Sequence, residues 1–230
     1  MDFQAKFIQN FIEDNRWQLI VYGLRNTLTI TLFALVLGII LGFLASLVRV
    51  THDTTGKLKP LNAVIKLYLT VVRGTPVVVQ LMIIYYVIFS PWPRFSSIVI
   101  AIIAFGINSG AYVAEIFRSG IMSIDPGQME AGRSLGLTYG QTMRRIIMPQ
   151  AVKNVLPALG NESISLLKET SVAGYIGIRD LTRGGDIIRS RTYEAFLPLL
   201  AVALVYLCLV LLLTAGVSRL ERRLAVSDRR

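Results

Sequence analysis

The chain has 230 residues, of which 53% are hydrophobic and only 17% charged, and its mean hydropathy is +0.59. This composition is too apolar for an ordinary soluble domain of this length and places the chain in a bilayer. A formal net charge of +10 would suggest nucleic acid as the partner of a soluble protein. In a membrane protein the positions of the charges matter more than their sum, so no nucleic acid partner is expected.

The sequence offers little for catalysis. Its one histidine, His52, lies in a polar loop, and its one cysteine, Cys208, lies in an apolar stretch, so neither a metal site nor an intrachain disulfide is expected. The G-x-x-x-x-G-K-[ST] pattern of nucleotide-binding loops does not occur. We therefore expect no catalytic residue and no cofactor in this chain, and any nucleotide chemistry must come from a partner.

The first 18 residues predict an amphipathic helix at the membrane interface. Phe3, Phe7, Ile8 and Phe11 recur at helical spacing with polar residues between them. Such a helix lies flat with its apolar face in the lipid. A signal peptide would start basic and end soon after a short apolar core, whereas this segment is partly acidic and runs into a full-length span. We expect it to be retained.

Five membrane-spanning helices are predicted after this segment, which makes the fold class an all-α integral membrane protein. Three stretches, Leu28–Val48, Ile98–Ala114 and Ala195–Val217, carry no charged side chain, and each can cross about 30 Å of hydrocarbon as a helix. The predicted spans are approximately 22–48, 61–90, 97–118, 151–170 and 195–218, within a transmembrane domain of residues 19–220.

Two of these spans need more than hydropathy. Residues 61–90 are too long for one upright helix and too short for two, and the sequence RGTP at 73–76 favours one broken or tilted span. Residues 155–167 are interrupted by polar residues and a proline. With this weak span included, one side of the membrane has 13 Lys and Arg against 5 Asp and Glu, and the other 8 against 6. The positive-inside rule then puts the N-terminus outside, the C-terminus in the cytoplasm, and residues 221–230 in a basic cytoplasmic tail.

Residues 125–149, on the cytoplasmic side, predict two short helices joined by a turn. Asp125 supplies an N-cap carboxylate, Gly136 can end the first helix, and Thr138 can begin the second. A soluble partner can hold such a rigid projection in a groove. On capping signals alone, a solvated loop with two caps is the alternative.

One set of residues in this region has a spacing that matches a known motif: Glu130, Ala131, Gly132, Gly136, Ile146 and Pro149. The spacing resembles the EAA motif of importer-type ABC transporter permeases, with Gly132 in place of the second alanine and Met148 in place of the leucine. Two flanking stretches, RGTPVVVQL at 73–81 and KETSV at 168–172, resemble segments typical of the polar amino acid permeases in this superfamily. The resemblance covers residues 17–220.

The resemblance implies a subunit of an ATP-driven amino acid importer in the inner membrane of a prokaryotic cell. Two permease subunits, for which we favour a homodimer, form the pathway, and two cytoplasmic ATP-binding subunits hold ATP and Mg²⁺. An extracytoplasmic amino-acid-binding protein supplies the substrate. The chain itself would be no enzyme. The residues that we expect to couple it to the ATPase are Glu130, Ala131, Gly132, Arg133 and Gly136.

Residues that line the pathway can be sought by helical angle. On the third span Asn108, Tyr112 and Glu115 fall within about 60° at 100° per residue, which gives this helix one polar face. Alternatively, Asn108 and Tyr112 bridge neighbouring helices and Glu115 pairs with Arg118. Small residues on the opposite face, and the G-x-x-x-G at 38–42 in the first span, predict close helix packing.

The broken span contributes two further pathway residues, Thr75 and Gln80. The sequence Thr-Pro at 75–76 can begin a half-helix whose free N–H groups face the carboxylate of a substrate. The alternative is a simple kink.

Glu162, near the middle of the fourth span, is the main candidate for contact with the substrate. A carboxylate at membrane depth either has a partner or serves a ligand, and the alternative is a structural ion pair with Lys168, Lys66 or Arg73. A cationic substrate would offset the cost of the buried charge, so we predict a polar L-amino acid with a basic side chain. If Glu162 instead holds the α-ammonium group, it carries no side-chain preference.

Two other classes of function are open to such a sequence. A secondary amino acid or ion transporter works without an ATPase and usually has internally repeated spans, which we do not find. An integral-membrane enzyme needs a base, nucleophile or metal ligands at workable spacing, and no such set occurs.

Overall fold

The structure is a computed structural model that describes residues 2–92 and 94–227. In these ranges every regular element is helical and no strand occurs, in agreement with the predicted all-α class. The α-helices are α1 (Phe3–Phe7), α2 (Trp17–Thr55), α3 (Lys59–Gly74), α4 (Val77–Ile83), α5 (Ser97–Met122), α6 (Pro126–Ser134), α7 (Tyr139–Thr142), α8 (Met148–Glu169), α9 (Leu181–Thr192) and α10 (Phe196–Ser227). Turns of π-helix cover Ile8–Ile12, Ile84–Ile88 and Met143–Ile147, and 3₁₀ turns cover Glu13–Asn15 and Thr170–Ile176.

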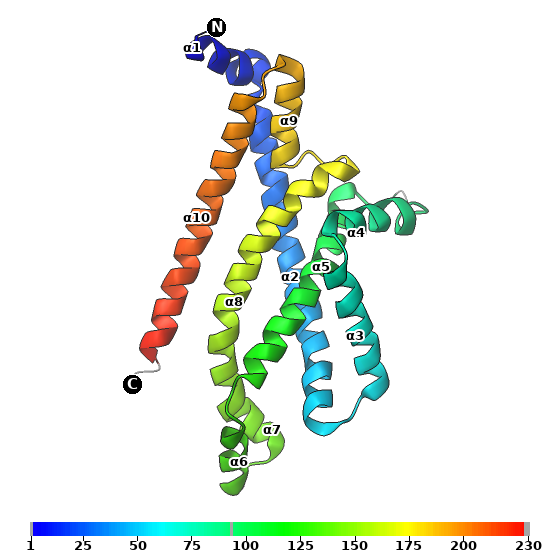
Figure 1. Cartoon of the computed structure of the whole chain (residues 1–230), viewed down its shortest axis with the longest axis vertical. Helices are drawn as coiled ribbons and strands as arrows, with labels where there is room; N and C mark the ends of the chain where they lie inside the picture. Colours follow the sequence, from blue (N-terminus) through cyan, green and yellow to red (C-terminus); the bar gives the residue numbers. More distant parts are fainter. Residues whose placement is uncertain (1, 93, 228–230) are drawn as a thin grey trace.

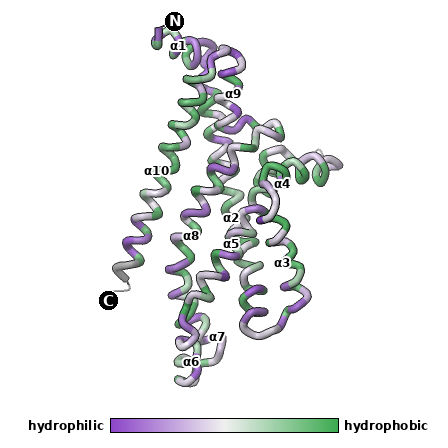
Figure 2. The backbone as a smooth tube through the Cα atoms, in the orientation of Figure 1, coloured by the Kyte–Doolittle hydropathy of each residue, from purple (hydrophilic) through white to green (hydrophobic). Residues whose placement is uncertain are grey.

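The helices form an elongated bundle with two distinct ends. The N-terminus, α1 and α9 lie at one end, whereas α6, α7 and the turn between α2 and α3 lie at the other (Figure 1). We call them the α9 end and the α6 end. Hydrophilic residues gather toward both ends, with longer apolar stretches between them (Figure 2). Helix α10 includes the predicted basic tail as far as Ser227, and residues 228–230 lie outside the described residues.

The N-terminal segment packs against the corner between α9 and α10. Its helix ends at Ile12, and the chain turns at Asp14, which has a positive φ of 51°, before α2 begins. Asn10 is 0% exposed; its amide nitrogen donates to the Glu194 carboxylate at 3.3 Å, and its oxygen accepts from the Thr192 hydroxyl at 2.8 Å. These bonds fix the segment to the rest of the chain. Its position in the membrane interface stays a prediction.

Of the described helices, α2, α5 and α10 are long and apolar enough to cross a membrane. The bent pair of α3 and residues 77–88 adds a fourth span if it is counted as one. Helix α8 has 22 residues but contains Pro157, Asn161 and Glu162, which keep its hydropathy low. The predicted count of five spans therefore depends on α8, and it stays a prediction.

The predicted break in the second span is present. α3 ends at Gly74, α4 begins at Val77, and the two axes are bent by 112°. Thr75, between them, has an extended backbone because the ring of Pro76 disfavours the helical conformation at the residue before it, and Pro76 is extended as well. The amides of Val79 and Gln80 both donate to the carbonyl of Pro76, so a new helix starts there.

Helices α2 and α5 have the most extensive contact of any two described elements. A Cβ atom added to Gly42 would lie 2.6 Å from Val113, and one added to Gly38 would lie 3.0 Å from Ser109. A Cβ on Gly106 would lie 2.6 Å from Leu37. The small residues at these positions therefore permit the close packing that the sequence predicts.

The main apolar core lies beside this pair, toward the α9 end. It is formed by buried residues of α2, α4, α5 and α8 and of the 3₁₀ turn after α8, among them Ile30, Leu81, Phe105, Leu166 and Ile176. The core holds the break between α3 and α4 against α5. That contact positions the polar residues described next.

Candidate functional site

Gln80 closes the break between α3 and α4. Its amide nitrogen donates to the Val72 carbonyl at 2.7 Å and to the carbonyl and hydroxyl oxygens of Thr75 at 3.0 and 2.8 Å. Its amide oxygen accepts from the side chain of Asn108 on α5 at 2.9 Å. Three of the predicted pathway residues, Thr75, Gln80 and Asn108, therefore form one hydrogen-bonded chain. This chain satisfies carbonyls that the break leaves without helical partners.

Asn108 is left with an unused acceptor. Its side chain is 2% exposed, and its Oδ1 atom has no hydrogen-bond donor among the described residues. Buried polar atoms without a partner are rare in proteins, and each needs an explanation. The bridging role that was the alternative for Asn108 is present, and it uses only the amide nitrogen.

Glu162 is held by a hydroxyl group. Its carboxylate accepts a hydrogen bond of 2.7 Å from Ser109 on α5, and the side chain is half-buried. None of the ion pairs between described residues includes Glu162, so the alternative partners Lys168, Lys66 and Arg73 do not pair with it. Ser109 was outside the predicted polar face, because it lies 100° around α5 from Asn108. Its polar side chain in an apolar span is the signal that could have found it.

Tyr112 and Glu115 belong to different surroundings. The guanidinium of Arg73, at the end of α3, lies 5.6 Å from the centre of the Tyr112 ring. Glu115 forms an ion pair of 2.6 Å with Arg118, which is the predicted alternative for this residue. Arg118 also contacts Asp53 at 3.4 Å.

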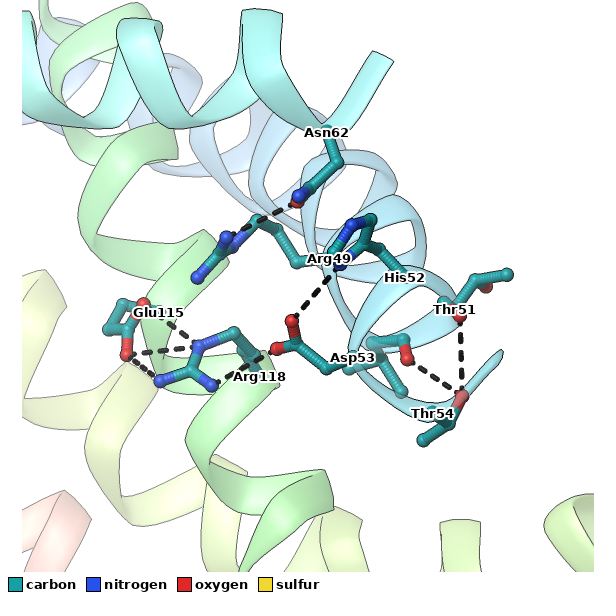
Figure 3. A network of polar contacts seen from close by, with 9 residues as sticks. Arg49, Thr51, His52, Asp53, Thr54, Asn62, Glu115 and Arg118 are labelled. Atoms are coloured by element: carbon teal, nitrogen blue, oxygen red, sulfur yellow. Dashed lines mark hydrogen bonds and ion pairs between the residues drawn. The ribbon is translucent and has the colours of Figure 1, made fainter. Parts of the chain in front are cut away.

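The Glu115 pair is part of a network toward the α6 end. Figure 3 shows how Arg118 lies between Glu115 and Asp53, and how Arg49 reaches Asn62 on α3. The Arg49 guanidinium donates to the Asn62 oxygen at 3.2 Å. The network thus joins α2, α3 and α5. Hydropathy and helical angle did not identify it, because its members come from three separate elements.

A second charged group lies at the α9 end, around a cavity of about 420 Å³. Asp180, which is 0% exposed, accepts from the backbone N–H groups of Thr182 and Arg183 at 3.0 and 3.4 Å and so caps α9. Burial raises the pKa of Asp180 to about 6 despite these bonds. Hydrogen bonding by Arg189 lowers the pKa of Asp186, which lies on α9 nearer to solvent.

Both helix starts predicted at the α6 end are present, but the second helix is not short, because α7 continues through the π-helical turn Met143–Ile147 into α8. The Asp125 carboxylate accepts from the Gly127 amide at 2.8 Å, and Thr138 and Gln141 form a reciprocal capping box. Gly136 has a φ of +82°, as expected for a glycine that ends a helix. Glycine is needed at 132 as well, because a Cβ there would lie 2.5 Å from Thr142.

The tip of this helix pair is exposed. Of the residues predicted to couple to an ATPase, Glu130, Ala131, Arg133 and Gly136 lie on the surface, and Gly132 is buried against α7. Leu135, between the two helices, is 81% exposed. Sequence reasoning passed over this leucine, although an apolar residue directly before a helix-ending glycine is visible in the sequence.

Comparisons with known proteins agree with this architecture. The family described as "Binding-protein-dependent transport system inner membrane component" matches residues 34–226. The chain is 38% identical over 214 residues to the arginine transport system permease protein ArtQ of Bacillus subtilis, covering 91% of this chain and 94% of that protein. It is 38% identical over 210 residues to the glutamine transport system permease protein GlnP of Escherichia coli, covering 90% and 94%.

A solved structure adds to these relatives. It is described as an amino acid ABC transporter with histidines, is 40% identical to this chain, and superimposes with a TM-score of 0.85 over 97% of this chain and 99% of its own. The chain therefore belongs to the family of binding-protein-dependent transport system inner membrane components, as a permease subunit of the amino acid ABC importer type.

Proposed function

We propose that two copies of this chain form the pathway of an ABC importer for a polar, preferably basic, L-amino acid. An extracytoplasmic binding protein supplies the substrate, and cytoplasmic subunits that bind ATP and Mg²⁺ drive transport. The observation that carries the proposal is Glu162, a half-buried carboxylate in the second half of α8 whose hydrogen bond comes from the neutral hydroxyl of Ser109. A carboxylate at this depth that forms no ion pair with a described residue can be neutralised by a cationic group of the substrate during transport.

The proposed topology has five spans, with the N-terminus outside. It is supported by the agreement of two independent features. The basic segments that the sequence assigns to the cytoplasm include the α2–α3 turn and the α6–α7 pair, and both occur at the α6 end (Figure 1). The N-terminus lies at the opposite end. We accordingly count α8 as a span and α1 as an interfacial helix.

The proposed coupling element is the α6–α7 pair. Two capped helices and an exposed leucine make a firm projection that fits a groove in an ATP-binding subunit. Glu130, Ala131 and Arg133 would contact that subunit, while Gly132 and Gly136 shape the turn. Closure of the ATPase would then move α8, which follows the pair in the chain, relative to α5, which precedes it.

Uptake by the complete complex tests the proposal. Vesicles that contain the chain, its ATP-binding subunit and its binding protein are supplied with labelled amino acids, and Glu162→Gln is compared with Glu169→Gln. Glu169 is a second half-buried carboxylate on α8 and serves as the matched control. We expect ATP-dependent uptake by the wild type, retained by Glu169→Gln and strongly reduced by Glu162→Gln.

The pattern of the loss distinguishes the two readings of Glu162. Loss of basic amino acids with neutral uptake retained assigns Glu162 to the substrate side chain, and equal loss for all assigns it to the α-ammonium group. Uptake by Glu162→Gln at the wild-type rate would make the residue structural and the site assignment wrong.

A further inference from the structure

Arg73 lies at a depth where a free cation needs an explanation. It is 14 residues beyond the start of α3, or about 21 Å along the helix, in a membrane whose hydrocarbon is about 30 Å thick. Its side chain is exposed, and no ion pair between described residues includes it. Glu115 lies within its electrostatic range but forms its hydrogen bonds with Arg118.

The contact of Arg73 with Tyr112 fixes the guanidinium but does not neutralise it. At 5.6 Å from the ring centre, the cation–π interaction restrains the side chain against α5. The cost of an arginine in hydrocarbon exceeds the attraction of one aromatic ring. The guanidinium must therefore border a watery pathway or a polar group from outside the chain.

Helix α5 contacts both this cation and an anion. Ser109, which holds Glu162, and Tyr112, beneath Arg73, are three residues apart on α5. On an α-helix this means about 4.5 Å along the axis and about 60° around it. A carboxylate from α8 and a guanidinium from α3 thus flank one turn of α5, and neither is paired with an opposite charge among the described residues.

This arrangement is complementary to an amino acid. A zwitterion carries a carboxylate and an ammonium group on one carbon atom, and an arginine guanidinium binds carboxylates with two parallel hydrogen bonds. We propose that Arg73 binds the α-carboxylate of the transported amino acid, with Tyr112 positioning its guanidinium. The inference rests on the proposed function, because it places the substrate between Arg73 and Glu162. The inference is the same whether Glu162 binds the α-ammonium group or a basic side chain of the substrate.

Asn108 gives a second reason to place substrate polar groups here. Its buried Oδ1 atom lies on the same face of α5, one turn from Tyr112, and has no donor among the described residues. This oxygen has a free lone pair, so an ammonium group that reaches it when the packing around α5 opens can donate to it.

The inference predicts that the permease itself binds amino acids with a free α-carboxylate more tightly than those without one. We would measure equilibrium binding to the permease–ATPase complex in nanodiscs without the binding protein, so that the selectivity of that protein does not enter. The probes are L-arginine with L-argininamide and L-glutamine with L-glutaminamide. Each pair differs only in the α-carboxylate, which the amide replaces by a neutral group.

The variants are Arg73→Gln, Arg73→Lys and Arg94→Gln. The wild type should bind the acid of at least one pair about 10- to 100-fold more tightly than its amide, as expected for a hydrogen-bonded charge pair. Arg73→Gln should bind acid and amide equally, through weaker binding of the acid alone. Arg73→Lys should keep part of the preference, and Arg94→Gln, which removes an arginine outside the described helices, should keep all of it.

Several outcomes overturn the inference. If Arg73→Gln keeps the wild-type preference for the acid, Arg73 does not read the carboxylate. If the Arg73→Gln complex falls apart into single permease chains by native mass spectrometry, Arg73 is a contact between subunits. A wild-type complex that binds acid and amide equally contradicts the inference alone, whereas one that binds no amino acid contradicts the proposed function too.

Discussion

Asp180 is an acid whose burial has a measurable consequence. It lies where α2 passes the start of α9, so close that a Cβ on Gly23 would be 2.6 Å from the Asp180 carbonyl oxygen. With a pKa of about 6, the folded chain binds a proton at Asp180 more strongly than the unfolded chain does. The stability that this residue contributes is present below the unfolded pKa of about 3.9 and is lost as the pH rises through 6.

We therefore predict that Asp180→Asn gains stability relative to the wild type as the pH is raised from about 4 to about 7. The asparagine oxygen can still accept one N–H bond at the start of α9, so the change mainly removes the charge. The measurement is the thermal unfolding midpoint in detergent at several pH values. Asp186→Asn is the control: the pKa of Asp186 is lowered, so its contribution is already present above the unfolded pKa of about 3.9, and the difference from the wild type should stay nearly constant over this range. A difference between wild type and Asp180→Asn that does not vary with pH would contradict the prediction.

Single residues were predictable where helical angle alone decides. The angle placed Asn108 and Tyr112 on one face of α5, and both contact the broken span, through Gln80 and Arg73 respectively. The identity of these partners was not predictable, because it depends on how far the 112° bend brings α3 and α4 toward α5. Ser109 was missed because only one face of α5 was considered. It lies 100° around the helix from Asn108 and contacts a different helix, α8.

At the scale of elements, the α6–α7 pair depends on one backbone conformation. Gly136 has a φ of +82°, and a Cβ there would meet no atom within 4 Å. A substitution would therefore be strained by its backbone and not by crowding. A residue with a side chain pays about 1 kcal/mol in this conformation.

We predict that Gly136→Asp abolishes transport-linked ATP hydrolysis while membrane insertion stays normal, because it strains the turn and adds a charge to the proposed docking surface. Gly56→Asp is the matched control: Gly56 also has a positive φ, +70°, and open space around it, but it lies in the α2–α3 turn. ATPase activity stimulated by the loaded binding protein should be lost in the first variant and kept in the second. Normal transport by Gly136→Asp at normal expression would exclude the pair as the coupling element.

Elements were predictable where the hydrophobic pattern is long. Uninterrupted apolar runs predicted α2, α5 and α10, although α2 extends to Thr55 because polar residues can continue a helix beyond the lipid. Helix α9 received no prediction, yet its buried positions, which are Leu181, Gly184, Gly185, Ile188 and Thr192, recur at helical spacing after an N-cap aspartate. The three π-helical turns leave no signal in composition, because they arise from packing.

At the scale of the whole molecule, a single chain leaves charged and polar groups uncovered at membrane depth. Arg73 and Thr75 are exposed, and Glu162 is half-buried. Lipid cannot satisfy these groups, whereas a second copy across a two-fold axis can cover them or enclose water. Charge asymmetry along the sequence predicts the two sides of the membrane, but no pattern in a sequence specifies which faces of two copies meet.

We predict that the purified complex contains two copies of this chain. Native mass spectrometry of the complex, with the ATP-binding subunit present, counts them directly. A size-matched complex of a related permease pair encoded by two different genes is a suitable calibration. A complex with only one permease chain, or with one copy of this chain and one of a different permease, would rule out the homodimer.

The glycine contacts between α2 and α5 decide which parts of the molecule can move. Gly38, Gly42 and Gly106 leave no space for even one methyl group, so the two helices cannot slide or turn past each other without overlap. The two helices therefore move as one body, and the relative movements of a transport cycle must be made by the helices around them. Glu162 lies on α8 and Arg73 on α3, whereas Ser109 and Tyr112 lie on α5, one of the two fixed helices. Each movement of α3 or α8 relative to α5 would therefore change the distance between these two opposite charges. The substrate would be bound or released as that distance changes.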